Sequence, residues 1–138
     1  MTPAVGTALP PKEFAVTRAD LIRYAGASGD RNPVHWSDRH AAAVALPGVI
    51  AHGMLTMARA ARVVTEWTDD PTSLVDYQVR FSRPVVVPDD DAGTVLTVTA
   101  VVTEIVDAAH VRVDITATAA GAEVLTRASA LVRLPTAR

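Results

Sequence analysis

Alternation of apolar and polar residues dominates the second half of the chain. Residues 75–81 place Asp76, Gln78 and Arg80 between apolar side chains, which is the two-residue period of a strand with one buried face. The β-branched stretch that follows and two further alternating stretches are separated by turn-forming Asp and Gly residues. The pattern predicts consecutive antiparallel strands at 75–81, 94–106, 111–117 and 124–134.

A helical spacing of three and four residues appears between His52 and Trp67. It predicts one helix of roughly 22 Å, long enough to form the axis of a small domain. The apolar face expected for this helix comprises Met54, Leu55, Ala58, Ala61 and Val64 with Thr65.

Shorter elements are predicted before this helix. Thr17, with Asp20 three residues later, is typical of a helix N-terminus, and the glycines at 26–29 end that helix. A short strand is expected at 13–16, and Ser37 is expected to begin a second short helix that runs to Ala43.

Helices early and strands late indicate an α+β fold in which the sheet covers the long helix. With 138 residues, 49% of them hydrophobic, the chain is expected to form a single domain over residues 1–138. Residues 1–11 are rich in Pro, Ala and Gly and are expected to be a flexible leader.

Composition excludes several classes of function. A net charge of −2 without a basic run argues against a nucleic-acid partner. The absence of cysteine excludes disulfides and thiolate metal sites, and it is compatible with a cytoplasmic protein. No signal peptide or apolar run of about 20 residues is present, so no membrane partner is expected.

Candidate chemistry lies in the loop that connects the two short helices. Asp30 and His35 are five residues apart, Gly29 permits a sharp turn before them, and Pro33 rigidifies the backbone between them. A carboxylate and an imidazole that meet at one water could add or remove water across a carbon–carbon double bond.

Two sequence blocks carry a family resemblance. The segments Tyr24-x-x-x-Ser28-Gly29-Asp30-x-Asn32-Pro33-Val34-His35 and Ile50-Ala51-His52-Gly53-Met54-Leu55 resemble the signature and the central-helix start of MaoC-like (R)-specific enoyl-thioester hydratases and dehydratases. Within that family, the chain looks most similar to the small "B" subunits of actinobacterial 3-hydroxyacyl-ACP dehydratases.

The resemblance implies a hot-dog fold, in which an antiparallel sheet wraps around a long helix. It implies Asp30 and His35 as the catalytic pair and the Gly53 backbone N–H as the donor to the thioester oxygen. It also implies acyl-CoA or acyl-ACP substrates, no cofactor or metal, and a homodimer or a heterodimer with another hot-dog subunit.

Elementary chemistry supports the role of Gly53, because the N–H groups at a helix start lack internal partners and lie at the positive end of the dipole. Asn32 and His52 are further candidates for substrate binding or support of the site. One position departs from the family, where a serine on the central helix supports the site and Ala61 is the matching residue here. Thr56 and Ser28 are nearby hydroxyls without an obvious equivalent role.

Other readings of the same residues remain. A non-catalytic acyl-binding subunit of a heterodimer and a hot-dog thioesterase are alternative functions. A metal site formed by Asp30, His35, Asp38 and His40 is conceivable by ligand type, although the spacing does not favour it. Packing roles are expected for Met54, Met57, Trp36 and Trp67, and surface positions for His40 and His110.

Overall fold

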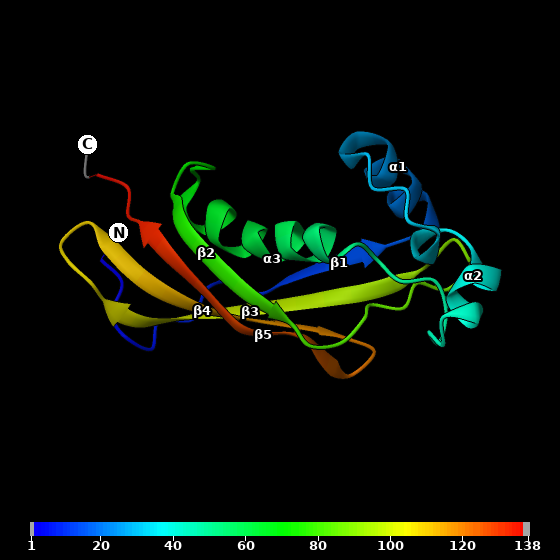
Figure 1. Ribbon diagram of the computed structural model, residues 1–138. Coiled ribbons are helices and arrows are strands. Elements are labelled where there is room, and N and C mark those ends of the chain that lie inside the picture. Colours follow the sequence, from blue (N-terminus) through cyan, green and yellow to red (C-terminus); the bar gives the residue numbers. More distant parts are fainter. Residues whose placement is uncertain (1, 137–138) are drawn as a thin grey trace.

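A five-stranded antiparallel sheet with one long helix across its face forms the body of the protein (Figure 1). The computed structural model describes residues 2–136. Its elements are β1 (Lys12–Val16), α1 (Arg18–Ser28), the 3₁₀ turn η1 (Pro33–His35), α2 (Asp38–Ala43), α3 (Gly53–Thr68), β2 (Leu74–Phe81), β3 (Thr94–Ile105), β4 (His110–Ala119) and β5 (Ala122–Arg133). This arrangement confirms the expected α+β, hot-dog architecture.

The sheet has the strand order β1-β3-β4-β5-β2, with every neighbouring pair antiparallel. Tight hairpins connect β3 to β4 and β4 to β5, whereas β1 and β2 come from earlier in the chain and form the two edges. The three long strands supply half of the buried apolar side chains, including Val98, Val102, Val111, Val113, Ala130 and Val132.

Helix α3 packs on this face with a side that matches the predicted one only in part, since Leu55 and Val64 are buried as expected. Met54 is 59% exposed and Ala58 is also exposed, so their expected places in the core are wrong. The buried face comprises Leu55, Thr56, Ala60, Val63, Val64 and Thr68. Two threonines lie on this face, and a pattern of apolar residues does not predict them; the Thr68 hydroxyl is hydrogen-bonded to the Val64 carbonyl and to Ser73.

Local capping signals are confirmed at the first helix. Thr17 and Asp20 form a reciprocal capping box, and Gly29 ends α1 in the left-handed conformation with φ 76°. Leu21 and Ala25 are buried, whereas the apolar Ile22 between them is exposed. Helix α1 therefore contacts the rest of the protein through a narrow stripe.

The N-terminal segment lies against the sheet, which contradicts the expected flexible leader. Its Gly6 N–H donates to the Val102 carbonyl at 2.8 Å, and its Leu9 N–H donates to the Ala100 carbonyl at 2.9 Å. Leu9 is only 3% exposed. One buried leucine and backbone bonds to β3 thus fix a segment whose Pro and Gly content suggested mobility.

Two tryptophans behave differently. Trp67 is partly buried and packs against the core, as expected. Trp36 is half exposed and donates from Nε1 to the Arg31 carbonyl, so its expected role as a packing anchor is wrong.

Within residues 2–136, none of the helices combines the length and the apolar character that a bilayer span needs.

Candidate active site

A chain of short-range hydrogen bonds shapes the loop between α1 and α2. The Asp30 N–H donates to Ser28 Oγ, the Asn32 N–H to Asp30 Oδ1, and the Val34 N–H to Asn32 Oδ1, all within 3.1–3.2 Å. These turns are the ones that Ser, Asp and Asn side chains favour. One carboxylate oxygen of Asp30 is therefore occupied by its own loop, and the other is directed at His35.

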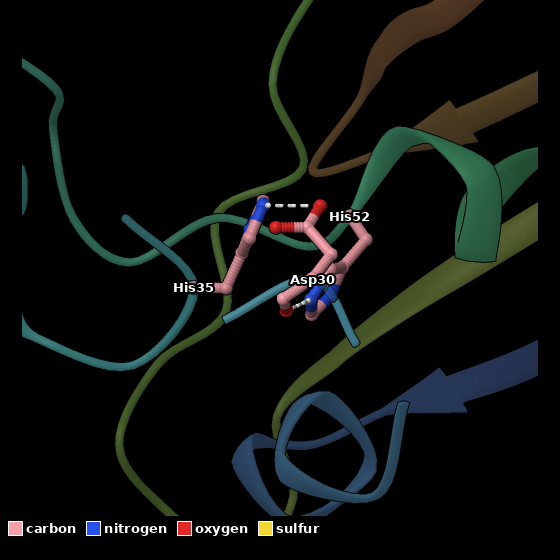
Figure 2. A group of neighbouring side chains, drawn as sticks. All are labelled: Asp30, His35 and His52. Atoms are coloured by element: carbon pink, nitrogen blue, oxygen red, sulfur yellow. Dashed lines mark hydrogen bonds and ion pairs between the residues drawn. The ribbon is translucent and has the colours of Figure 1, made fainter. Parts of the chain in front are cut away.

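The His35 imidazole is fixed by a backbone carbonyl. Its Nδ1 lies 2.7 Å from the Ile50 carbonyl oxygen, which can only accept, so Nδ1 carries the hydrogen. Its Nε2 faces Asp30 Oδ2 at 3.7 Å (Figure 2). That separation exceeds a direct hydrogen bond and suits a bridging water or a reacting hydroxyl group.

His52 supports both members of the pair from the interior. Its ring stacks on His35 with centroids 3.7 Å apart and planes at 21°, and it contacts Tyr24 on another side. Its Nε2 lies 3.1 Å from the Asp30 backbone oxygen (Figure 2). Burial lowers the pKa of the His52 imidazole, so the neutral ring with Nε2–H donating to Asp30 is the form that fits.

Helix α3 begins next to this cluster with an open end. Its N-cap residue is His52, which makes no side-chain capping bond, because its ring is turned toward Asp30 and His35. The Gly53 N–H, at the first helical position, has no intrahelical acceptor by geometry. An oxygen atom with partial negative charge would be stabilised at this end of the helix.

A cavity of about 270 Å³ connects the helix start to the imidazole. Its buried walls include His35, Ala51, Thr56, Val85 and Val124, together with Gly53. The exposed segment 81–84 forms its rim. A methyl group on Gly53 would come within 3.1 Å of the Phe81 ring, so the glycine keeps the helix start, the rim and the cavity close together.

The decisive comparison is with a family model. The model of the MaoC like domain matches residues 2–121 of the 138. The chain belongs to the MaoC-like family.

MaoC-like relatives share both sequence and fold with this chain. It is 40% identical over 83 residues to 3-hydroxyacyl-thioester dehydratase X of Mycobacterium tuberculosis. That match covers 58% of this chain and 28% of the relative. A structure called MaoC-like dehydratase superposes with a TM-score of 0.91 at 36% identity, covering 96% of this chain and 41% of the other. R-hydratase PhaJ1 from Pseudomonas aeruginosa superposes with a TM-score of 0.83 at 29% identity, covering 98% of this chain and 84% of the other. This chain thus spans less than half of the first two relatives.

The MaoC-like signature residues fall into two groups in space. Asp30, His35 and His52 are brought together, and Gly53 lines the adjoining cavity with His35. Asn32 caps η1 through its side-chain oxygen and does not line the cavity, so the structure gives it a role in shaping the loop. Ala61 is half buried and is not a wall residue either.

The MaoC-like cluster also contains three groups of metal-ligating type, Asp30, His35 and His52. An imidazole binds a metal in the plane of its ring, and two stacked rings with nearly parallel planes cannot direct their lone pairs at one ion. The other conceivable set is not assembled, because the carboxylate of Asp38 pairs with Arg18 at 2.8 Å. This hydrogen-bonded pairing also lowers the pKa of Asp38.

Sequence reasoning gave Thr56 no role, although the structure places it in the cavity wall three residues after Gly53. The available signal was its position, since residues three apart on a helix share a face.

Proposed function

We propose that this MaoC-like chain hydrates 2-enoyl thioesters to (3R)-hydroxyacyl thioesters and catalyses the reverse dehydration. The single observation that carries this proposal is the gap of 3.7 Å between His35 Nε2 and Asp30 Oδ2, beside an uncapped helix start that lines the same cavity as His35. A water that contacts both atoms from one side would have a proton acceptor and a proton donor within reach.

The proposed hydration step balances within the pair. The water oxygen bonds to C3 of the enoyl group while the pair takes one of its protons, and the electrons of the double bond move toward the thioester oxygen. The pair then returns one proton to C2, which restores the carbonyl. Because both events use groups on one side of the substrate, addition is syn, and dehydration is the same path reversed.

The thioester oxygen gains negative charge midway through this step. The Gly53 N–H at the helix start is suited to stabilise that charge, because it is preorganised and needs no rearrangement. The cavity walls restrict water around the developing enolate, which strengthens the interaction.

His52 acts as a positioning residue in this proposal. Its hydrogen bond to the Asp30 carbonyl holds the loop, and its stacking fixes the plane of the His35 ring. A neutral His52 ring suits the task, because a positive charge stacked on the His35 ring would disturb proton transfer there.

The test measures loss of enoyl-thioester absorbance with crotonyl-CoA, followed by chiral analysis of the hydroxyacyl product. Asp30→Asn and His35→Gln are expected to lower kcat by about 10²–10⁴-fold, the range for loss of a general acid or base. His40→Gln, in α2, is the matched control and is expected to retain activity. Wild-type rates in both site variants would refute the assignment.

The same assay separates the alternative functions. Release of free thiol without hydroxyacyl product would identify a thioesterase. Saturable binding of a saturated acyl thioester without turnover, alone or with a second hot-dog subunit, would identify a non-catalytic subunit.

The proposed carriers are coenzyme A and acyl carrier protein, and the proposed assembly is a homodimer or a heterodimer with another hot-dog chain. Edge strand β2 supports an assembly, because it carries exposed apolar residues such as Val75 and Phe81. Light scattering of the purified chain distinguishes a dimer from a monomer that awaits a partner. The expectations of a single domain, of a "B"-subunit relationship and of a cytoplasmic location stay predictions.

A further inference from the structure

The Thr56 hydroxyl is a polar group in the wall of the proposed active site. Thr56 is 5% exposed and lines the same cavity as His35 and Gly53. Helical threonines commonly donate to the carbonyl four residues earlier, which here is that of His52. Among the hydrogen bonds of residues 2–136, none involves the Thr56 hydroxyl, whereas the buried Thr68 hydroxyl of the same helix is fully engaged.

Helix geometry directs this side chain toward the Gly53 end. Residues three apart lie on one face, and Cα–Cβ bonds tilt toward the helix N-terminus. The patch that a helical side chain covers therefore lies over the preceding turn, which for Thr56 begins at Gly53. Both groups border one cavity, which confirms that they share a space accessible to a ligand.

We propose that the Thr56 hydroxyl donates a second hydrogen bond to the thioester oxygen, beside the one from the Gly53 N–H. This inference rests on the proposed hydratase function and adds a substrate-contacting residue to it. Thr56 donates a hydrogen bond and keeps its proton, while the proton for C2 still comes from the pair of Asp30 and His35. Its engagement strengthens as the enolate forms, so it acts mainly on the transition state.

Apart from His35, the other buried side chains of the cavity wall are apolar, and Ser82 and Arg83 lie in its exposed rim. Ala51, Val85 and Val124 line the cavity around Thr56 and offer no polar partner through their side chains. A valine would fill nearly the same volume and bring no polar group into the wall, so packing alone does not account for the threonine. A role toward a ligand oxygen accounts for a threonine at this position.

The test uses two variants that separate the hydroxyl from the shape. Thr56→Val keeps the branched shape and removes the donor, and Thr56→Ser keeps the donor and removes a methyl group. Thr56→Val is expected to lower kcat on the order of 100-fold with little change in KM, as for loss of one oxyanion donor. Thr56→Ser is expected to stay near the wild-type kcat, and thermal melting checks that both variants fold.

A spectroscopic readout makes the result independent of turnover. A cinnamoyl thioester absorbs at longer wavelength when its carbonyl oxygen accepts stronger hydrogen bonds. The red shift on binding is expected to shrink in Thr56→Val and to persist in Thr56→Ser. An unchanged kcat and red shift in Thr56→Val would overturn the inference, as would equal losses in both variants, which would indicate shape alone.

Failure of the proposed function would look different. A wild-type protein that gives the hydroxyl-dependent red shift without hydrating any enoyl thioester would retain the Thr56 contact and lose the hydratase assignment. A protein that hydrates crotonyl-CoA with an unaffected Thr56→Val variant would retain the hydratase assignment and lose the Thr56 contact.

Discussion

The two ends of helix α3 are built in opposite ways. At the C-terminal end, Asp69 adopts a left-handed conformation and its N–H donates to the Thr65 carbonyl. The Thr68 hydroxyl lies 3.2 Å from the Val64 carbonyl and 2.7 Å from Ser73 Oγ, deep in the protein. At the N-terminal end, His52 makes no capping bond, and Gly53 opens onto a cavity.

The C-terminal end of α3 contributes to stability, and the N-terminal end is available for function. A side-chain N-cap is typically worth about 1 kcal/mol, and the chain forgoes it at the end that faces Asp30 and His35. The capped end anchors the helix to the start of β2. The uncapped N–H groups at the start of α3 thus mark the place where a ligand oxygen would complete the hydrogen bonding.

The largest expected effect comes from removing one N–H at the open end. Gly53→Pro deletes that donor at the first helical position, where proline is tolerated, and His52 already has the extended ψ of 132° that a following proline requires. We expect kcat/KM for crotonyl-CoA to fall by about 10²–10³-fold, as for other oxyanion donors.

Gly53→Ala is the matched control for that variant. It introduces the same Cβ atom, at 3.1 Å from the Phe81 ring, without the rest of the proline ring, and keeps the N–H. The role of the N–H in catalysis would be refuted if alanine and proline reduced kcat/KM equally, since crowding alone would then account for both losses.

An intermediate effect is expected at the closed end. Thr68→Val leaves Ser73 buried without its hydroxyl partner, so we expect the free energy of unfolding to drop by about 1–3 kcal/mol. Urea denaturation measures that drop, and the kcat of the folded variant is expected to match the wild type.

Removing both hydroxyls sharpens the same test. The double variant Thr68→Val with Ser73→Ala is expected to lose less than the sum of the single losses, because no unpaired group remains. A large loss of kcat in Thr68→Val without a loss of stability would contradict the assignment of stability to the C-terminal end of α3 and of catalysis to its N-terminal end.

The smallest expected effect concerns acid sensitivity near the open end. Burial lowers the pKa of His52 below its ordinary 6.5, so the unfolded chain binds a proton that the folded chain resists as the pH falls below that value. The free energy of unfolding should therefore decrease from about pH 6.5 downward, at no more than about 1.4 kcal/mol per pH unit for this one proton.

His52→Phe keeps a stacking ring and cannot be protonated. Its denaturation curves between pH 8 and pH 5 are expected to lose part of the acid decrease, while kcat falls because the bond to the Asp30 carbonyl is gone. His40→Phe, in α2, replaces a histidine outside the site and is the control. Identical pH profiles for wild type and His52→Phe would show that His52 does not titrate differently on folding.

The fold was largely predictable because its signals are local. The Thr17 capping box and the left-handed Gly29 follow from side-chain chemistry within four residues, and the alternation from residue 75 onward sets the strands. Periodicity predicted the buried face of α3 only in part: Leu55 and Val64 are buried as expected, whereas the polar Thr56 and Thr68 are also buried and the apolar Met54 is exposed. Leu9 shows the same limit, since its burial depends on a strand ninety residues later.

The site was predictable where its residues are close in sequence. Asp30 and His35 share one loop, and Gly53 begins an obvious helix. The contacts of His52 with Asp30 and His35 depend on how α3 meets that loop, and the Ile50 carbonyl that fixes the His35 tautomer has no side-chain signature. The place of Thr56 in the site follows only from its position in the cavity wall, which the three-dimensional structure shows.

The open start of α3 has a practical consequence for finding ligands. A compound that satisfies this end binds the folded chain and not the unfolded one, so it raises the melting temperature by mass action. At a concentration of 100 times its dissociation constant, the gain is about 2.7 kcal/mol. Thermal-shift screening of saturated acyl thioesters of graded length could therefore rank chain length and carrier without any turnover.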